Sequence, residues 1–236
     1  MAQKRIAPER IDKCPDTLND NAFYGIELDE KQKEFRDAIW DDNYDIIFCN
    51  SIAGTGKTLI AVATANLLVQ YRKYDGIVYV ISNTQEERIG FLPGDIASKV
   101  EPYTAPLYDA LYKIGVNPNV AINQMSILNS KEGTGYIDAI SHTYLRGCNL
   151  ERKVVIIEES QNFYLDELKK TLTRIHDTSK TIVIGHSGQC DLYKNPERSG
   201  FSTYLKHFEG KSRCKVCSLE KNYRGWVSNW ADNLNF

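Results

Sequence analysis

The sequence predicts an α/β fold in which one doubly wound, mainly parallel sheet is flanked by helices. Four short apolar runs rich in Ile and Val have the length and composition of buried strands. Most of these runs are separated by helix-length segments, and strands that alternate with helices pair in parallel through right-handed crossovers. The chain has 236 residues, which is enough for one sizeable domain of this class and too few for two.

The elements can be placed in order along the chain. Residues 1–27 contain many turn-forming side chains and predict an irregular arm, whereas residues 28–236 form the domain. Residues 28–40 carry apolar side chains among charges at a spacing typical of an amphipathic helix. The predicted strands span residues 45–50, 76–82, 153–158 and 180–185. Further helices are predicted at 57–71 and 166–175, and at 95–100 and 106–114 within a long connection that contains Gly and Pro.

The composition limits the classes of function. It is 42% hydrophobic and 25% charged, an ordinary globular balance. The 29 basic and 31 acidic residues leave a net charge of −2, so any contact with nucleic acid must come from a local patch. Residues 1–15 lack the apolar segment of a secretion signal, and no apolar run approaches the length of a membrane span.

The six cysteines are scattered, which is typical of proteins in a reducing compartment. Only Cys214 and Cys217 form a close pair. A zinc site would need a second pair of ligands at similar spacing, which the sequence lacks, so we interpret this pair as two positions of a short strand. We therefore expect a cytoplasmic protein without membrane contact.

A phosphate-binding loop is the strongest signal in the chain. The segment Ala53-Gly-Thr-Gly-Lys-Thr58 lies between a predicted strand and a predicted helix and matches the G-x-x-x-x-G-K-[ST] pattern with one departure, Ser51 in place of the first Gly. Gly54 and Gly56 let the backbone turn its N–H groups towards a phosphate. Lys57 supplies a positive charge for the β- and γ-phosphates, and the Thr58 hydroxyl is suited to ligate Mg²⁺. The predicted nucleotide-binding residues of this segment are Ser51, Ala53, Gly54, Thr55, Gly56, Lys57 and Thr58.

Two carboxylates end the third predicted strand. Glu158 and Glu159 follow a run of Val and Ile. In phosphate-loop ATPases the first such carboxylate orients the Mg²⁺ shell, and the second polarises the attacking water. Taken alone, two glutamates after a strand are more often the start of a helix. Their position beyond a phosphate loop favours the catalytic interpretation, with Glu158 for Mg²⁺ and Glu159 for water.

With these motifs the sequence resembles the PhoH (phosphate-starvation-inducible) family of RecA-like ATPases, which is related to superfamily 1 helicases. The resemblance covers about residues 28–225 and implies ATP and Mg²⁺ as ligands. Beyond the phosphate loop it is carried by Gly90-Phe-Leu-Pro-Gly-Asp95, Lys99-Val-Glu-Pro-Tyr103, Pro106-Leu-Tyr-Asp-Ala-Leu111, Tyr144-Leu-Arg-Gly147, Glu159-Ser-Gln-Asn162 and Leu172-Thr-Arg-Ile175. The segment 90–95 is the most specific of these.

The resemblance also implies roles for two glutamines. Gln32 would read the adenine edge, although a glutamine on a polar helix face otherwise points to solvent. Gln189 would sense the γ-phosphate and couple it to nucleic acid. The sequence departs from the family pattern at Ser51, Asn83, Glu158 and His186. These departures favour a divergent member, and a viral origin would account for them.

The resemblance further implies an assembly, since one RecA-like domain lacks the partner domain that supplies arginines to the γ-phosphate in helicases. A neighbouring subunit of a ring, which we expect to be a hexamer, would supply the arginine in trans. The candidates are Arg174, Arg224 and Arg146, of which the first two lie in motif-like contexts. The predicted catalytic residues are Lys57, Glu159, Gln189, Arg174 and Arg224.

Two functions remain open from the sequence. The first is an ATPase coupled to RNA or single-stranded DNA, with helicase-like activity. The second is a nucleotide-gated, oligomeric binding protein with little turnover, which the altered Glu158 and His186 favour. A small-molecule kinase is a weaker third hypothesis, because the resemblance leaves little room for an acceptor domain. Tyr71-Arg-Lys-Tyr74 mixes bases and aromatics as a nucleic-acid contact would, but it is also an ordinary helix end.

Overall fold

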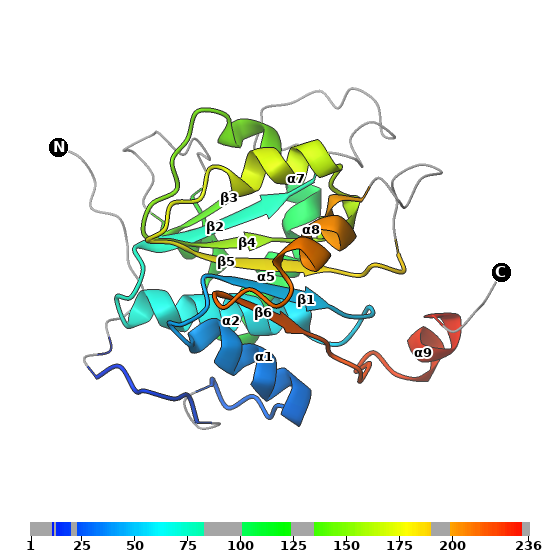
Figure 1. Ribbon diagram of the computed structural model, residues 1–236. Coiled ribbons are helices and arrows are strands. Elements are labelled where there is room, and N and C mark those ends of the chain that lie inside the picture. The colour runs from blue at the N-terminus through cyan, green and yellow to red at the C-terminus, as the bar shows by residue number, and fades with distance from the viewer. Residues whose placement is uncertain are drawn as a thin grey trace.

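A computed structural model describes residues 11, 13–19, 23–82, 101–123, 135–189 and 199–232. Six strands form one sheet in the order β3-β2-β4-β5-β1-β6, and every neighbouring pair is parallel (Figure 1). The strands are β1 (Ile46–Asn50), β2 (Gly76–Ile81), β3 (Ile137–Ser141), β4 (Lys153–Ile157), β5 (Lys180–Gly185) and β6 (Cys214–Cys217). The predicted α/β class with a parallel sheet is confirmed.

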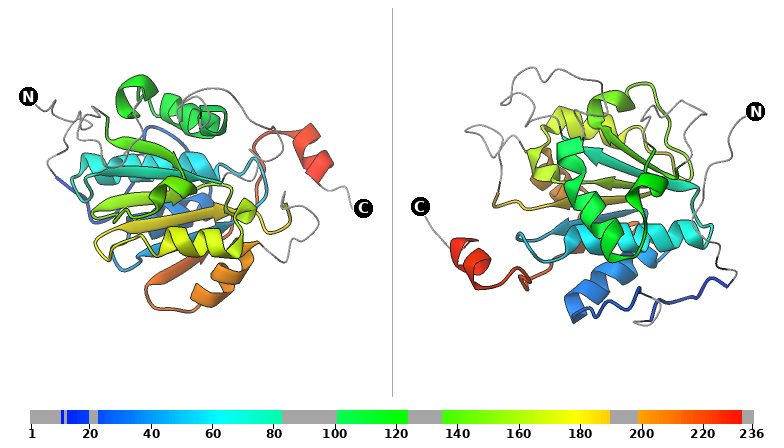
Figure 2. Two further views of the ribbon diagram at one scale, coloured as in Figure 1. Left: turned by 90° about the horizontal axis from the view of Figure 1, so that it is seen from above. Right: turned by 180° about the vertical axis from the view of Figure 1, so that it is seen from behind.

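Helices cover both faces of the sheet. The α-helices are α1 (Glu30–Trp40), α2 (Lys57–Gln70), α5 (Ala105–Lys113), α6 (Pro118–Ala121), α7 (Leu165–Leu172), α8 (Gly200–Phe208) and α9 (Trp226–Asp232). Short 3₁₀ turns lie at Glu101–Thr104, His142–Leu145 and Ser160–Asn162. Figure 2 shows α1, α2 and α5 together on the face seen from behind, whereas α7 and α8 cover the opposite face.

Alternate residues of each strand point into two separate cores, as period-2 side chains must. Ile47 and Tyr79 pack with α1, α2 and α5, whereas Phe48 and Val80 pack with α7 and α8. Because both faces are covered, the strands read as continuous apolar runs in the sequence. Leu18 and Phe23 of the N-terminal arm are buried in the first core.

The structure contains every predicted strand and one strand, β3, that was not predicted. All four predicted strands are present, and the pair Cys214 and Cys217 lies in the short strand β6 as interpreted. Strand β3 was not predicted, because Asp138 interrupts its apolar run. In the structure Asp138 is buried and accepts a hydrogen bond of 2.6 Å from Asn123 Nδ2. A paired polar side chain is thereby tolerated inside the sheet.

The helices differ from prediction at the end of α7 and in helices that were not predicted. The predicted helix at 166–175 is wrong at its end, since α7 stops at Leu172. Beyond it the Leu150 N–H donates to the Arg174 carbonyl at 2.9 Å, and this long-range pairing replaces the last helical turn. Helices α6, α8 and α9 were not predicted. The predicted helix at 95–100 lies outside the described residues.

The parallel topology decides where a site can form. The carboxyl ends of β1, β4, β5 and β6 meet at one edge of the sheet, which we call the carboxyl edge. The phosphate loop, the acidic pair, His186 and the segment that leads to α9 all follow these ends. None of the described helices is long and apolar enough to span a membrane.

Candidate nucleotide-binding site

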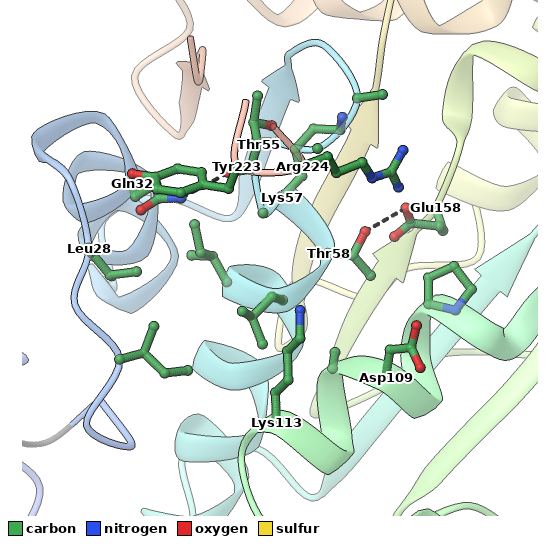
Figure 3. Close-up of a pocket in the computed structure, with 18 of the residues that line it drawn as sticks. Leu28, Gln32, Thr55, Lys57, Thr58, Asp109, Lys113, Glu158, Tyr223 and Arg224 are labelled. Atoms are coloured by element: carbon green, nitrogen blue, oxygen red, sulfur yellow. Dashed lines mark hydrogen bonds between the residues drawn. The ribbon is translucent and has the colours of Figure 1, made fainter. Parts of the chain in front are cut away.

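A cavity of about 590 Å³ lies at the carboxyl edge of the sheet (Figure 3). Its walls come from residues 26–32, the phosphate loop and start of α2, helix α5, the segments after β4 and β5, and Tyr223 with Arg224. The crevice outside the carboxyl ends of the strands is where open parallel sheets bind ligands. The cavity therefore gathers segments from the whole length of the chain at the place that the fold favours.

The phosphate loop has the backbone that its glycines predict. Gly54 and Gly56 adopt left-handed conformations, with φ of 77° and 87°. Gly56 is the N-cap of α2, so the first N–H groups of that helix face the cavity without a side-chain cap. A helix N-terminus with free N–H groups favours an anion.

Lys57 lies folded against its own loop. Its Nζ donates to the carbonyls of Ser51 at 2.9 Å and Ile52 at 2.7 Å. Burial lowers the pKa of Lys57, and the charges of Glu158 and Glu159 oppose that shift. A phosphate oxygen would be a better acceptor for this ammonium than a carbonyl, because both partners would then be charged.

Ser51 is the one member of the predicted loop whose side chain does not line the cavity. It is buried, and its Oγ accepts a hydrogen bond from the Leu219 N–H beyond β6. Thr55 is also buried, and its hydroxyl donates to the Ile52 carbonyl at 3.1 Å. Ser51 thus ties β1 to β6, and only its carbonyl reaches Lys57.

The two carboxylates after β4 lie in different environments. Glu158 is buried, and its Oε1 accepts a hydrogen bond of 2.8 Å from the Thr58 hydroxyl (Figure 3). Burial, and then the charge of Glu159, raise the pKa of Glu158 to about 7. Glu159 is exposed and left-handed, with φ of 47°, and its Oε2 accepts from Gln161 Nε2. A non-glycine residue in this conformation is strained, as is frequent at functional sites.

The residues present fit a magnesium ion. Glu158 Oε2 and the Tyr79 hydroxyl are both buried and form no well-aligned hydrogen bond with the described residues, although each group affects the pKa of the other. A hydrated cation between the Thr58 hydroxyl and Glu158 would satisfy such an orphaned oxygen. No group of three or more His, Cys, Asp or Glu in the described part of the chain could hold a metal ion. This donor set suits Mg²⁺, which keeps several waters and takes one or two protein ligands together with phosphates.

Comparison with known proteins identifies the family. The model of the PhoH-like protein family matches residues 27–225. The chain belongs to the PhoH-like family. The PhoH-like protein of Synechocystis sp. is 36% identical over 188 residues, which cover 78% of this chain and 54% of that relative. The protein PhoH of Escherichia coli K12 is 35% identical over 181 residues, or 76% of this chain and 49% of that protein. The chain thus spans about half the length of these curated relatives.

Solved structures confirm the fold of this PhoH-like chain. The large terminase of a thermophilic bacteriophage superposes with a TM-score of 0.53 at 13% identity, covering 82% of this chain and 46% of the terminase. A second crystal form of that terminase, in complex with ADP, superposes with a TM-score of 0.51. At this identity the likeness concerns the RecA-like phosphate-loop fold alone.

Gln32, which the PhoH resemblance assigns to adenine, lies in the cavity wall with both amide groups engaged. Its Oε1 accepts from the Asp29 N–H at 3.1 Å, and its Nε2 donates to the Thr55 carbonyl at 2.9 Å. The first of these bonds belongs to the capping box that starts α1. In this arrangement Gln32 supports the phosphate loop, and reading adenine would require it to exchange a partner.

Residues 222–224 fold over the phosphate loop, and we call them the C-terminal strap. The Tyr223 N–H donates to the Gly54 carbonyl at 2.8 Å, and the Tyr223 hydroxyl donates to Asp29 Oδ2 at 2.8 Å. A Cβ on Gly54 would lie 2.6 Å from Asn222 Oδ1, which shows how closely the strap approaches. Arg224 lines the cavity of its own chain (Figure 3). The strap therefore places Arg224 at the cavity of its own chain, and its action at a neighbour's site stays a prediction.

The other predicted residues divide between the cavity and the far edge. Gln189 and His186 line the cavity. Gln161 links this segment to the acidic pair, since its Oε1 accepts from the His186 N–H at 3.0 Å. Arg174 lies at the opposite, amino edge of the sheet, and Arg146 is exposed after β3, so neither reaches this cavity. Asn83 and the segments at 90–95 and 99–100 lie outside the described residues.

Several cavity residues were not predicted. Tyr223 lines the cavity from the strap, where its hydroxyl donates to Asp29 behind the wall, and Asp109 and Lys113 enter from α5 (Figure 3). Tyr223 stands beside Arg224 in the sequence, which was the one available signal. The two α5 side chains carry no local signal, because only the packing of α5 on α2 brings them to the cavity.

Proposed function

We propose that this chain binds ATP with Mg²⁺ and hydrolyses it. The observation that carries the proposal is the cavity in which the phosphate loop faces a buried carboxylate, with Thr58 and Glu158 in contact at 2.8 Å. The N–H groups of the loop and Lys57 would hold the β- and γ-phosphates. Bound Mg²⁺, held by Thr58 and Glu158, would neutralise charge on the phosphates.

The remaining roles follow from where each side chain lies. Glu159 is exposed at the cavity, so it is suited to accept a proton from the attacking water as the γ-phosphate leaves ADP. Arg224 supplies a cation to the phosphates from the same chain. Gln189 borders the cavity, and Gln161 connects its segment to Glu159. A ligand on the surface beside residues 186–189 could thereby alter the position of the catalytic carboxylate.

We further propose that turnover is coupled to RNA or single-stranded DNA, as the relation of the family to helicases implies. A cytoplasmic ring, with a hexamer as the expected size, would complete the site by bringing Arg174 of a neighbour in trans. Support for a reducing compartment comes from the five described cysteines, all of which are free.

A second function is favoured by one observation. With a pKa of about 7, Glu158 is partly protonated at neutral pH, which weakens it as a metal ligand. A chain that binds nucleotide, assembles and turns over slowly would tolerate this. Such a nucleotide-gated binding protein is our alternative to the nucleic-acid-coupled ATPase.

The test is ATP turnover at several protein concentrations, with and without single-stranded RNA. We compare the wild type with Lys57→Ala and Glu159→Gln, and use Lys169→Ala and Glu151→Gln on exposed surfaces as matched controls. The ATPase predicts turnover that RNA stimulates and that falls at least about 100-fold in both site variants only. Tight ATP binding that Lys57→Ala abolishes, with negligible turnover throughout, would instead establish the binding protein.

A further inference from the structure

Helix α9 carries an exposed apolar surface. Trp226, Val227 and Trp230 are 72%, 73% and 68% exposed. The two indole rings stack with centroids 6.0 Å apart and an interplanar angle of 14°. Helix α9 extends from the body of the molecule beyond the carboxyl edge of the sheet (Figures 1 and 2). We call these three side chains the tryptophan face, and large exposed apolar residues gathered in this way mark an interaction site.

A complementary groove lies at the other end of the sheet. It has a volume of about 310 Å³ and is formed where α7 and α8 end and where β1, β5 and β6 begin. We call it the amino-edge groove, and its residues in this argument are Ile46, Leu172, Ile175, Phe208, Lys211 and Arg213. The first four give it an apolar floor. Arg213 is paired with Asp45, and Lys211 is an exposed cation at the rim.

The chemistry of the two surfaces matches. An indole side chain buries 150–250 Å² of mainly apolar surface in such a site, and its ring face attracts a Lys or Arg cation. Within one chain the two surfaces cannot meet. The strap fixes the start of α9 to Gly54 at the carboxyl edge, whereas the groove lies at the amino ends of the same strands.

We propose that the tryptophan face of one copy of this chain docks into the amino-edge groove of the next copy. Contact between two different surfaces of the same molecule is head-to-tail, and it closes into a ring when the rotation allows. Two indoles at about 70% exposure contribute roughly 300 Å², which is less than half of the ~800 Å² per partner in a stable interface. The tryptophan face is thus the centre of a larger interface, where aromatic residues contribute most.

Docking in this way would complete the nucleotide site. Arg174 lies between Leu172 and Ile175, which line the groove, and Trp226 follows Arg224, which lines the cavity. Docking would therefore bring Arg174 of the second copy, which borders the groove in sequence, towards the end of the first copy that carries the cavity. This inference rests on the proposed ATPase, and it names the surfaces through which a second arginine arrives.

The first test is sedimentation velocity over a range of protein concentrations with Mg²⁺ and ADP. We expect Trp226→Ala combined with Trp230→Ala to weaken self-association at least 10-fold, and Lys211→Glu at the groove rim to weaken it several-fold. Tyr112→Ala combined with Tyr144→Ala, which removes two exposed aromatics elsewhere, should assemble like the wild type. Unchanged assembly of the tryptophan variant would overturn the proposal, and so would normal assembly with a loss of single-stranded RNA binding.

The second test mixes two impaired chains. The tryptophan double variant lacks the docking face but keeps its groove and Arg174, whereas Arg174→Ala keeps the docking face. In the mixture, Arg174→Ala copies can dock into intact grooves and receive Arg174 in trans. Since such an arginine is worth ~10³–10⁵ in rate, the mixture should turn over ATP at least 10-fold faster than the sum of its parts.

The two tests separate the interface from the ATPase. If the wild type hydrolyses ATP but the mixture gains nothing, the docking proposal is overturned and the ATPase stands. If the wild type shows no turnover, the ATPase is overturned, and the sedimentation of the tryptophan variant alone decides the interface.

Discussion

The two walls of the nucleotide cavity are built in different ways. The phosphate wall is one continuous segment, 53–58, in which each role is filled by adjacent residues and by the backbone. The opposite wall, which we call the strap wall, joins segments from both ends of the chain, since the Tyr223 hydroxyl donates to Asp29. The phosphate wall is therefore fixed by local sequence, whereas the strap wall exists only once the fold is complete.

The two walls are nevertheless joined in a closed circuit of hydrogen bonds. Tyr223 donates its N–H to Gly54 and its hydroxyl to Asp29. The Asp29 N–H donates to Gln32, and Gln32 donates to the carbonyl of Thr55 in the same loop. A substitution in the strap wall should therefore affect the phosphate loop through these hydrogen bonds. The size of its effect on stability and ATP affinity should depend on which bond is lost.

Gly54→Ala should have the largest effect, because Gly54 lies where the two walls touch. The substitution adds a methyl 2.6 Å from Asn222 Oδ1 at a backbone φ of +77°. We expect a loss of unfolding free energy of roughly 2–4 kcal/mol from overpacking and backbone strain together. ATP affinity should fall with it, as measured by equilibrium binding and by urea unfolding.

Gly210→Ala is the matched control. Its φ is +76°, and a Cβ there would meet nothing within 4 Å. Gly210→Ala should lose about 1 kcal/mol of unfolding free energy, from backbone strain alone, and keep its ATP affinity. If Gly54→Ala behaves like Gly210→Ala, the strap does not press on the phosphate loop.

Glu158→Gln tests the buried carboxylate that accepts a hydrogen bond from Thr58 of the phosphate wall. The pKa of Glu158 rises from an ordinary value of 4.5 to about 7 on folding, so the folded chain holds a proton that the unfolded chain releases. Wild-type stability should therefore fall as the pH rises from about 4.5 to 7, and stay level above that, at a total cost of up to roughly 3–4 kcal/mol of unfolding free energy.

The amide has no charge to bury, so Glu158→Gln should be nearly flat across that pH range. Urea unfolding of the nucleotide-free chain at pH 5 and pH 8 measures the difference. Glu151→Gln, an exposed control, should keep the wild-type slope. Parallel pH profiles for the wild type and Glu158→Gln would contradict the assigned burial of charge.

The difference between the walls explains what the sequence could predict. The positions of Lys57, Thr58 and Glu158 at the cavity were predictable, because a phosphate-binding loop requires fixed residue types at fixed spacing after a strand. The position of Arg224 was not predictable, since nothing local shows whether the strap returns to Gly54 or reaches another chain. Here a long-range hydrogen bond decides the outcome.

The same reasoning applies to the fold. Strands β1, β2, β4 and β5 were predicted from uninterrupted apolar runs, and these form the interior of the sheet. The edge strand β3 was missed, since Asp138 is acceptable there only through its contact with Asn123. The last turn of the predicted helix at 166–175 was lost to pairing with Leu150. In each case a tertiary contact outweighed the local pattern.

Gln32→Met should have a smaller effect than the changes above. It removes the bonds to Asp29 and Thr55 with little change in volume, and should lower the unfolding free energy by about 1–2 kcal/mol. Because both bonds support the phosphate loop, we expect ATP and GTP affinities to fall together, by roughly 10-fold. Parallel titrations with the two nucleotides make the measurement. A fall confined to ATP would instead assign Gln32 to the adenine edge.

Tyr223→Phe should have the smallest effect, because it removes one bond of the circuit and leaves the backbone of the strap in place. The lost bond joins the Tyr223 hydroxyl to Asp29 Oδ2 at an exposed position. The unfolding free energy should therefore fall by about 0.5–1 kcal/mol. ATP affinity should fall less than about 5-fold. Urea unfolding and ATP titration measure both quantities, with Tyr144→Phe as an exposed control.

A double-mutant cycle of Tyr223→Phe with Asp29→Asn isolates this bond from the capping role of Asp29. Because Asp29 also accepts from the Gln32 N–H at 2.8 Å, Asp29→Asn alone should cost more than Tyr223→Phe. A coupling near zero would mean that the hydroxyl contact does not hold the strap, and that the backbone bond to Gly54 acts alone. A loss of ATP affinity beyond 10-fold in Tyr223→Phe would contradict the expected order of the two walls. The strap wall would then contribute as much to ATP binding as the phosphate wall.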